Sequence, residues 1–370
     1  MNLSNPETNH PSTADALWVI DGHEDIAWNG LEYGRNPSTS AYSSRLADYQ
    51  NGVTQLTGTR TLGLPEWISG RVGIVFSTIF VEPAAANTPS PSRMVYHNSE
   101  EASRFGLEQI AFYRALAERD AHFRIITNQR ELDEIVSYWS QNQDGLNAAV
   151  GFVLLMEGAD PIVKPEDVHT WAQAGLRLIG LSWSGTRYAG GTHAPGPLTD
   201  LGRQLLKEME SAKMILDLSH CAEEAYLEAV DTYGGVIIAS HSNPRRFLPT
   251  DRGLSDEMIL KLVRRDGVIG IVPYNAFLNP NWKAGTPRLS VDKVVEAIDY
   301  IVQLAGNARY VAIGTDFDGG FGSESIPEGM DTIADILKIS SALDRKGYTQ
   351  EAIYAIMHQN WLRILRRGLP

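Results

Sequence analysis

Residues 17–28 read LWVIDGHEDIAW and join an apolar run to a cluster of polar side chains. Leu17–Ile20 has the length of a buried strand, and the polar cluster stands where such a strand would end. In extended backbone His23 and Asp25 point to the same side, about 6.6 Å apart along the strand. An imidazole nitrogen and a carboxylate at this spacing can bind one divalent ion. Taken alone, the stretch is better explained as a strand followed by a structural polar turn.

Composition indicates a large globular protein. The chain has 370 residues, of which 43% are hydrophobic and 21% charged. Its net charge of −13 argues against nucleic acid or an anionic membrane as partner. The single cysteine, Cys221, excludes an intramolecular disulfide, so we expect any metal to be bound by His, Asp and Glu. No secretory signal or membrane-spanning run is visible, and we expect a cytoplasmic location.

Short apolar runs alternate with segments of helical periodicity after residue 16. Eight runs have strand character: Leu17–Ile20, Gly73–Val81, Gly151–Met156, Leu176–Leu181, Met214–Leu218, Gly235–Ala239, Gly267–Pro273 and Tyr310–Gly314. Almost wholly apolar strands, each followed by a helix, indicate a parallel sheet covered on both faces. Eight such units predict an α/β fold, a (β/α)8 TIM barrel, and the helical periodicity after the last run adds extra C-terminal helices.

The domain organisation follows from the same pattern. We predict one domain over residues 17–370 and a disordered tail over residues 1–16. Two segments interrupt the alternation as long loops, Asn29–Gly70 and the glycine- and proline-rich Arg187–Pro197. Both follow the carboxyl end of a strand, where barrel enzymes build their sites.

Side chains that bind metals or transfer protons follow five of the eight runs. They are His23, Asp25, Glu157, His220, His241, Asp316 and Asp318. For any one of them, a helix cap or a structural histidine is the simpler interpretation. In a closed barrel, however, these strand ends meet at one mouth. Three histidines with a bridging and a chelating carboxylate suit two zinc-like ions, about 3.5–4 Å apart.

The residues also carry a family resemblance. The stretches DGHEDIAW, MEGAD, LDLSH, SHSN and GTDFDG resemble the membrane (renal) dipeptidases, peptidase family M19, in order and spacing. The resemblance extends to HQNWLRIL near the C-terminus. It implies an amidohydrolase-type barrel with two zinc ions, one bound by His23 and Asp25, the other by His220 and His241, with Glu157 bridging them.

The same resemblance implies roles in the reaction. Asp316 matches the family's acid/base residue, and Arg252, in PTDRGLSDE, matches the arginine that binds the substrate's C-terminal carboxylate. We therefore expect a zinc-dependent dipeptidase that attacks the peptide bond with a hydroxide held between two ions. Asp316 would accept the proton and return it to the leaving amine. A small dipeptide is the expected partner, and a homodimer is possible.

One segment departs from the family pattern. LSWSGTRYAGG places Trp183 where the family has a substrate-contacting histidine. An indole has one N–H donor and cannot titrate, and loss of an oxyanion donor typically costs about 10²–10³ in turnover. Trp183 or His193 could supply the donor, and Tyr274 is a further candidate for substrate contact. Alternatively the protein is a binuclear amidase for N-acyl amino acids or another modified dipeptide, or a catalytically weakened binding protein.

Overall fold

The computed structural model describes residues 16–84, 92–141 and 148–370. The predicted tail therefore lies outside the described residues except for its last position. Within the described chain, eight parallel strands form the barrel: β1 (Val19–Glu24), β2 (Val72–Phe80), β6 (Val150–Glu157), β7 (Leu176–Gly180), β10 (Ile215–Asp217), β11 (Ile237–Ile238), β12 (Ile269–Ile271) and β13 (Val311–Ile313). Each overlaps one of the predicted apolar runs, which confirms the predicted strands, although β1 extends to Glu24, beyond the predicted end at Ile20.

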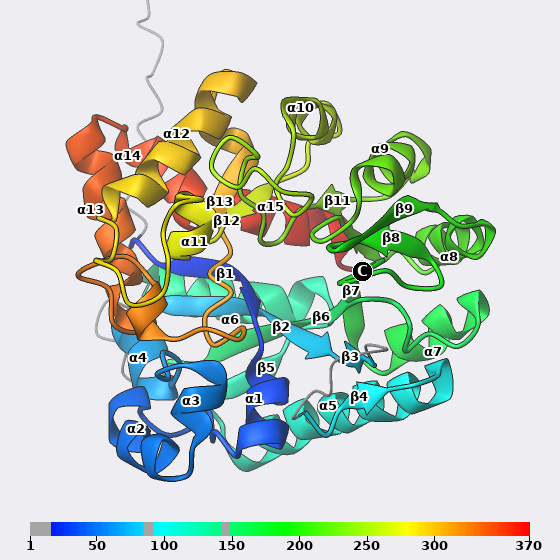
Figure 1. Ribbon diagram of the computed structural model, residues 1–370, viewed down its shortest axis with the longest axis horizontal. Coiled ribbons are helices and arrows are strands. Elements are labelled where there is room, and N and C mark those ends of the chain that lie inside the picture. Colours follow the sequence, from blue (N-terminus) through cyan, green and yellow to red (C-terminus); the bar gives the residue numbers. More distant parts are fainter. Residues whose placement is uncertain (1–15, 85–91, 142–147) are drawn as a thin grey trace, which may run out of the picture.

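The sheet closes on itself. Strands β1, β2, β6, β7, β10 and β11 pair in that order, and β12 pairs with β13. Isolated parallel bridges, Ala239 to Ile269 and Glu24 to Phe317, connect these two groups into a ring (Figure 1). Every residue of β2 and β6 is buried, as expected for parallel strands that are covered on both faces.

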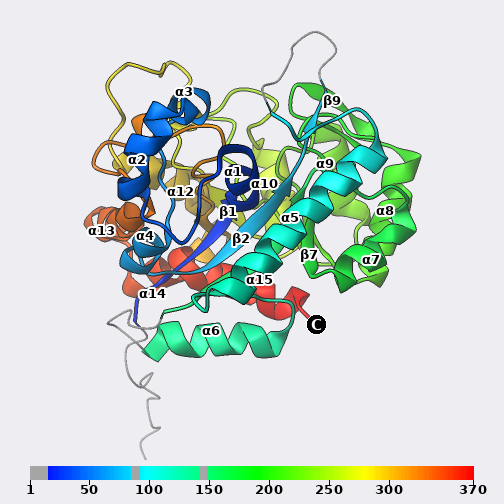
Figure 2. The same cartoon turned by 90° about the horizontal axis from the view of Figure 1, so that it is seen from below.

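Helices surround the barrel and connect successive strands. The outer helices include α5 (Ser99–Arg119), α6 (Gln129–Gln141), α7 (Val168–Gln173), α8 (Asp200–Ser211), α9 (Glu223–Thr232), α10 (Asp256–Arg264) and α12 (Asp292–Ala305). Figure 2 shows α5 lying alongside β2. The side chains of Thr199 and Ser255 accept N–H groups in the first turns of α8 and α10, and so cap these helices.

Three C-terminal helices follow the last strand: α13 (Leu337–Lys346), α14 (Gln350–Tyr354) and α15 (Asn360–Gly368), with a π-helical turn at Ala355–Gln359. Helix α13 packs against α12, whereas the π-helical turn and α15 lie against β1 and β13, at the end of the barrel where the strands begin. Asn360 Nδ2 donates to the carbonyl oxygens of Ala308 and Val311, at the start of β13. Trp361 Nε1 donates to Ile313 O at 2.7 Å. The opposite end, where the strands finish, is left for the functional side chains.

The segment Asn29–Gly70 is not a loop, contrary to the prediction. It contains most of α1 (Ile26–Tyr33) and all of α2 (Ala41–Gln50), α3 (Val53–Thr57) and α4 (Leu64–Ser69). Glycines with positive φ separate the helices, which keeps them short and weakens the periodicity that would reveal them.

The second predicted loop, Arg187–Pro197, is largely an antiparallel hairpin formed by β8 (Ala189–Gly191) and β9 (Ala194–Leu198). Short strands also form at β3 (Glu82–Pro83), β4 (Val95–Tyr96) and β5 (Phe123–Ile125). Among the residues described, no helix combines the length and apolar character needed to cross a membrane.

Candidate metal centre

The end of β1 carries the first two predicted ligands. His23 is fully buried, and Asp25 stands directly before α1, where its Oδ1 accepts a hydrogen bond from Thr78 Oγ1. His23 Nε2 has no hydrogen-bond partner among the described residues and lies 3.6 Å from Glu157 Oε2. A buried ring nitrogen that faces a carboxylate without a partner is suited to binding a cation.

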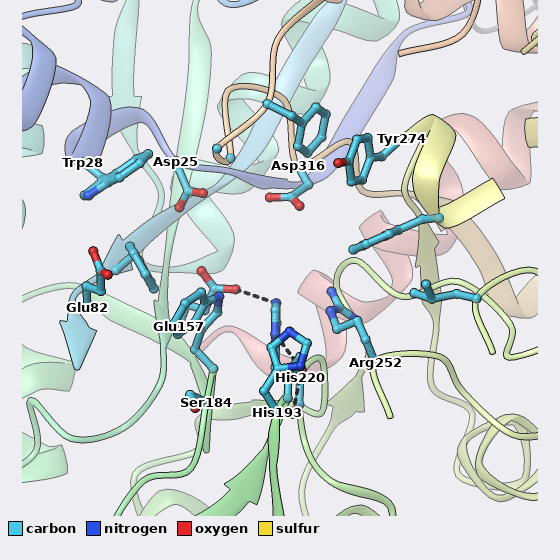
Figure 3. A pocket seen from close by; sticks show the side chains of 18 of the residues that line it. Asp25, Trp28, Glu82, Glu157, Ser184, His193, His220, Arg252, Tyr274 and Asp316 are labelled. Atoms are coloured by element: carbon cyan, nitrogen blue, oxygen red, sulfur yellow. Dashed lines mark hydrogen bonds and ion pairs between the residues drawn. The ribbon is translucent and has the colours of Figure 1, made fainter. Parts of the chain in front are cut away.

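Glu157, the last residue of β6, lies at the centre of the cluster (Figure 3). Its Oε1 is 3.1 Å from His220 Nε2 and 3.3 Å from His241 Nε2. These two ring nitrogens are themselves 3.0 Å apart. Two imidazole lone pairs cannot face each other at this distance unless a proton or a cation lies between them.

The donor set fits divalent metal ions. Two groups contain the predicted ligands, with the ligand atoms of each group within 4.8 Å of one another: His23, Asp25 and Glu157, and Glu157, His220 and His241. Glu157 belongs to both. A further group combines His23, His241 and Asp316. Imidazole nitrogens together with carboxylate oxygens form the ligand set that zinc prefers where cysteine is absent.

The carboxylates of the cluster favour a positive charge among them. Burial alone would lower the pKa of His23, but Glu157, Asp25 and Asp316 raise it to about 10. Burial, followed by the charge of Glu157, raises the pKa of Asp25 to about 6. Burial would raise the pKa of Glu157, but the charge of His23 lowers it well below its usual range. Divalent cations would balance these charges more completely than one protonated imidazole.

The other two histidines are held neutral. Burial, and next the charge of Arg252, lowers the pKa of His220 to about 4. Burial, followed by the charges of His23 and Arg252, lowers the pKa of His241 well below its usual range. A neutral imidazole is the form that binds a metal ion.

Asp316 reaches the cluster from the end of β13, which a bridge between Phe317 and Glu24 joins to β1. It follows β13 with φ of 57°, and its N–H donates to His23 O at 3.0 Å. Asp316 Oδ1 lies 3.9 Å from His23 Nε2. The side chain packs so closely over Gly319 that a Cβ there would lie 2.1 Å from Asp316 Oδ1. Burial raises the pKa of Asp316 well above its usual range.

Arg252 is a buried cation without an ion pair. Its side chain lines the same cavity, although the residue is only 5% exposed. Nη1 donates to Ser242 Oγ at 3.0 Å and Nη2 to His241 O, whereas Nε has no partner among the described residues. None of the ion pairs in the described chain includes Arg252. A buried guanidinium in this state is suited to binding an anionic group of a ligand.

The cavity over the cluster has a volume of about 530 Å³. Its walls include Trp183, whose ring centroid lies 5.1 Å from that of Phe80, and Tyr274, stacked on Phe321 at 4.2 Å. His193 lines the rim on the β8–β9 hairpin and is exposed. The structure therefore brings all ten predicted site residues together: eight line the cavity, and His23 and His241 lie buried against Glu157.

The sequence analysis missed several residues at this site, among them Glu82, Trp28 and Thr192. Glu82 and Trp28 line the cavity, and Thr192 Oγ1 lies 3.0 Å from His220 Nδ1. Glu82 comes two residues after β2, so its place at a strand end was a usable signal. Asp318 belongs to none of the candidate metal groups among the described residues: its Oδ1 accepts hydrogen bonds from Thr61 N and Oγ1, so it supports the neighbouring backbone.

Comparison with known proteins gives a consistent result. A family described as membrane dipeptidase, peptidase family M19, matches residues 12–368. An uncharacterised dipeptidase of Schizosaccharomyces pombe is 29% identical, with 94% of this chain and 80% of that protein covered. Dipeptidase tcpJ of Claviceps purpurea is 25% identical, with 94% and 76% covered.

Solved structures share the fold. A metallopeptidase of Rhodobacter sphaeroides, bound to a phosphinate mimic of L-Ala-D-Ala, superposes with a TM-score of 0.75. It is 24% identical, and the match covers 96% of this chain and all of that one. A family M19 metallopeptidase described as dipeptidase AC gives a TM-score of 0.77 at 24% identity, with 95% of this chain and 99% of that one covered. The (β/α)8 barrel predicted from the sequence is thereby confirmed.

Proposed function

Because the chain belongs to the membrane dipeptidase family, peptidase family M19, we propose that its strand-end cluster is the metal centre of a zinc-dependent dipeptidase with two ions. The chain is a metallo-dipeptidase by family. One observation carries the assignment of residues. Three imidazole Nε2 atoms converge on Glu157, inside a cavity that also contains the unpaired guanidinium of Arg252.

Five residues would hold the metal. His23 and Asp25 would bind one ion, His220 and His241 the other, and Glu157 both. When bound, a pair of divalent ions supplies an activated water and polarises the scissile carbonyl. The barrel floor of buried strands keeps these side chains fixed, so that little reorganisation is needed when the substrate enters.

Asp316 is the proposed general acid and base. It approaches the cluster from β13, with Oδ1 3.9 Å from His23 Nε2, and lines the cavity that the substrate would fill. From there its carboxylate can accept the proton released in the attack and give it to the leaving amine nitrogen.

The cavity also offers charges for both ends of a dipeptide. Arg252 would bind the C-terminal carboxylate through its unused N–H groups. Figure 3 shows Glu82 and Arg252 on opposite sides of the cavity, with Glu157 between them. Trp28 and Phe80 flank the Glu82 side, with ring centroids 5.9 Å apart. A carboxylate beside aromatic rings suits a free ammonium group, which favours dipeptides over N-acyl amino acids.

The test combines metal analysis with a substrate panel. We expect about two zinc ions per chain, and cleavage of L,L or L,D dipeptides in preference to N-acyl amino acids. Glu157→Gln, which has the same size but no charge to bridge two cations, should lose both metal and activity. Zinc-loaded protein that cleaves no member of the panel would contradict the proposal. Preferred cleavage of N-acyl amino acids would instead support the amidase alternative.

A further inference from the structure

A single hydroxyl contacts imidazole rings from both proposed ion sites. Ser240 follows β11 and is fully buried. Its Oγ lies 2.8 Å from Nδ1 of His241 and 3.4 Å from Nδ1 of His23. The same Oγ lies 2.5 Å from Asp217 Oδ2, to which it donates a hydrogen bond. For both ring nitrogens, Ser240 is the hydrogen-bond partner found in the described chain.

Counting protons fixes the direction of these bonds. Asp217 accepts two backbone N–H groups at Oδ1, from Ser219 at 3.0 Å and Ser240 at 2.8 Å. The Ser240 O–H points to Asp217 Oδ2, which at 2.5 Å is the nearest acceptor to this hydroxyl. The hydroxyl then has two lone pairs and no further hydrogen. His241 Nδ1 must therefore carry a hydrogen, and His23 Nδ1, at longer range, shares the second lone pair with Ser219 Oγ at 3.2 Å.

A hydrogen on Nδ1 leaves Nε2 of a neutral imidazole free to bind metal. The Nε2 atoms of His23 and His241 are the ones that face Glu157. We propose that Asp217 and Ser240 act as a positioning pair that fixes both histidines in the metal-binding tautomer, and so couples the affinities of the two ions. This inference rests on the proposed metal centre and adds residues that do not themselves touch the metal.

The position of Ser240 is set by the barrel interior. A Cβ at Gly270 or at Gly314 would lie 1.9 or 2.0 Å from Ser240 O, so the neighbouring strands approach as closely as only glycine permits. Ser240 therefore has little freedom to shift when a ligand histidine moves.

The third histidine lacks this constraint. His220 Nδ1 lies 3.0 Å from Thr192 Oγ1, on the β8–β9 hairpin. Among the described residues, the other hydrogen-bond partner of that hydroxyl is His220 O at 3.5 Å, and no carboxylate there accepts its hydrogen. Thr192 can thus donate or accept, and it touches a ligand of only one proposed ion. Removing the Ser240 hydroxyl and removing the Thr192 hydroxyl should therefore affect the two proposed ions differently.

The experiment measures zinc affinity in the full chain by competition with a chromophoric chelator. Ser240→Ala should weaken both ions by about 10- to 100-fold. Thr192→Val should weaken one ion and leave the other within about twofold. Ser77→Ala removes another fully buried strand hydroxyl, whose contact is Val75 O, and should leave both affinities unchanged. Selective loss of one ion in Ser240→Ala, or no loss, would overturn the coupling.

A second variant reverses the hydrogen bond without removing a side chain. In Asp217→Asn the amide oxygen can keep the two backbone bonds, while its NH2 group donates to Ser240 Oγ. The Ser240 hydrogen then turns to His241 Nδ1 and moves the ring hydrogen to Nε2. We expect Asp217→Asn to lose at least as much zinc affinity as Ser240→Ala. Wild-type affinity for both ions would overturn the inference.

Ring nitrogen NMR of metal-free protein provides a readout that needs no activity. Nitrogen-15 shifts should show a hydrogen on Nδ1 of His241 in the wild type and on Nε2 in Asp217→Asn. The reverse pattern in the wild type would overturn the inference even if a variant fails to fold. If the wild type bound no zinc, the proposed function itself would fail. Two bound ions with an unaffected Ser240→Ala would reject the positioning pair alone.

Discussion

The guanidinium of Arg252 is buried beside the ligand cluster with an unused N–H at Nε. A lysine at this position keeps the charge but cannot bind a carboxylate through two parallel N–H groups. We expect Arg252→Lys to lower kcat/KM for a dipeptide by about 100-fold, mostly through KM. The matched control is the same dipeptide with its C-terminus amidated. Wild type and variant should cleave the amide equally poorly, and a large difference on the amide would contradict the assignment.

Glu82 gives a prediction for the other end of the substrate. Because this carboxylate is partly exposed, its attraction for an ammonium group is modest, and Glu82→Gln should lower kcat/KM for free dipeptides by about fivefold. N-acetylated dipeptides, which lack the ammonium charge, should be unaffected by the change. Equal losses on both substrates would show that Glu82 supports the β3–β4 pair rather than the substrate.

The missing family histidine leaves two candidates for the oxyanion donor. Trp183 packs against Phe80 and lies 6.2 Å from His220 between ring centroids, whereas His193 lies on the exposed hairpin. If the indole N–H donates, Trp183→Phe should lower kcat by about 10²–10³ while His193→Ala changes it little. The opposite result would assign the role to His193. Steady-state kinetics of zinc-loaded variants distinguishes these outcomes.

Among the secondary-structure elements, the barrel strands were predictable and the inserted helices were not. A strand buried on both faces must be almost wholly apolar, so β2 and β6 were visible in the sequence. Helices α2 and α3 are short, and they expose Tyr42, Leu46 and Leu56 instead of burying an apolar face. Helices α2 and α3 are stabilised by tertiary contacts, and their sequences lack the apolar periodicity that would have predicted them.

The candidate functional residues also divide into those that the sequence could predict and those that it could not. Proposed ligands at the ends of apolar strands, such as Glu157 and His241, could be located because strand ends of a barrel converge. Thr192 could not, because its contact with His220 requires the β8–β9 hairpin to fold back over β10. The role of Ser240 also lies in distances that no spacing rule provides.

Asp318 connects the inserted helices to the barrel. Its buried carboxylate accepts Thr61 N at 2.8 Å and Thr61 Oγ1 at 2.7 Å, and lies 3.6 Å from Arg35 Nη1. Asp318→Asn keeps the shape but loses the charge, and should lower the free energy of unfolding by about 2 kcal/mol. Urea denaturation of metal-free protein measures this.

The control for Asp318 is another carboxylate that joins an inserted helix to the barrel. Asp331 binds Arg45 Nη1 at 2.9 Å, but its side chain is 43% exposed. Asp331→Asn should therefore change the free energy of unfolding by only about 0.5 kcal/mol. Equal effects of the two substitutions would mean that burial does not decide the strength of these connections.

For the molecule as a whole, a remote histidine makes stability depend on pH. His358, in the π-helical turn, is 3% exposed and stacks on Trp18 at 4.7 Å. Burial lowers its pKa from 6.5 to about 4. Between these values the unfolded chain binds a proton that the folded chain does not, so stability falls as pH falls, by about 3 kcal/mol over the whole window.

The test compares His358→Phe with the wild type, both metal-free. The phenyl ring keeps the stacking but cannot titrate. We expect the urea midpoint of the wild type to fall more steeply than that of the variant between pH 6.5 and pH 4. Parallel slopes for His358→Phe and the wild type would contradict the prediction.

The two isolated bridges that close the barrel also separate the strands that carry the proposed metal ligands from the strands that lead to the substrate side of the cavity. The proposed metal ligands stand on β1, β6, β10 and β11, whereas β12 and β13 lead to Tyr274 and Asp316. Residues 276–282, together with Gly320 and Phe321, can therefore vary during evolution without disturbing the proposed ligands of the metal. A lineage with this arrangement can acquire new substrates through changes in the segments that follow β12 and β13. Laboratory libraries confined to these segments should yield altered specificity while the metal content stays the same.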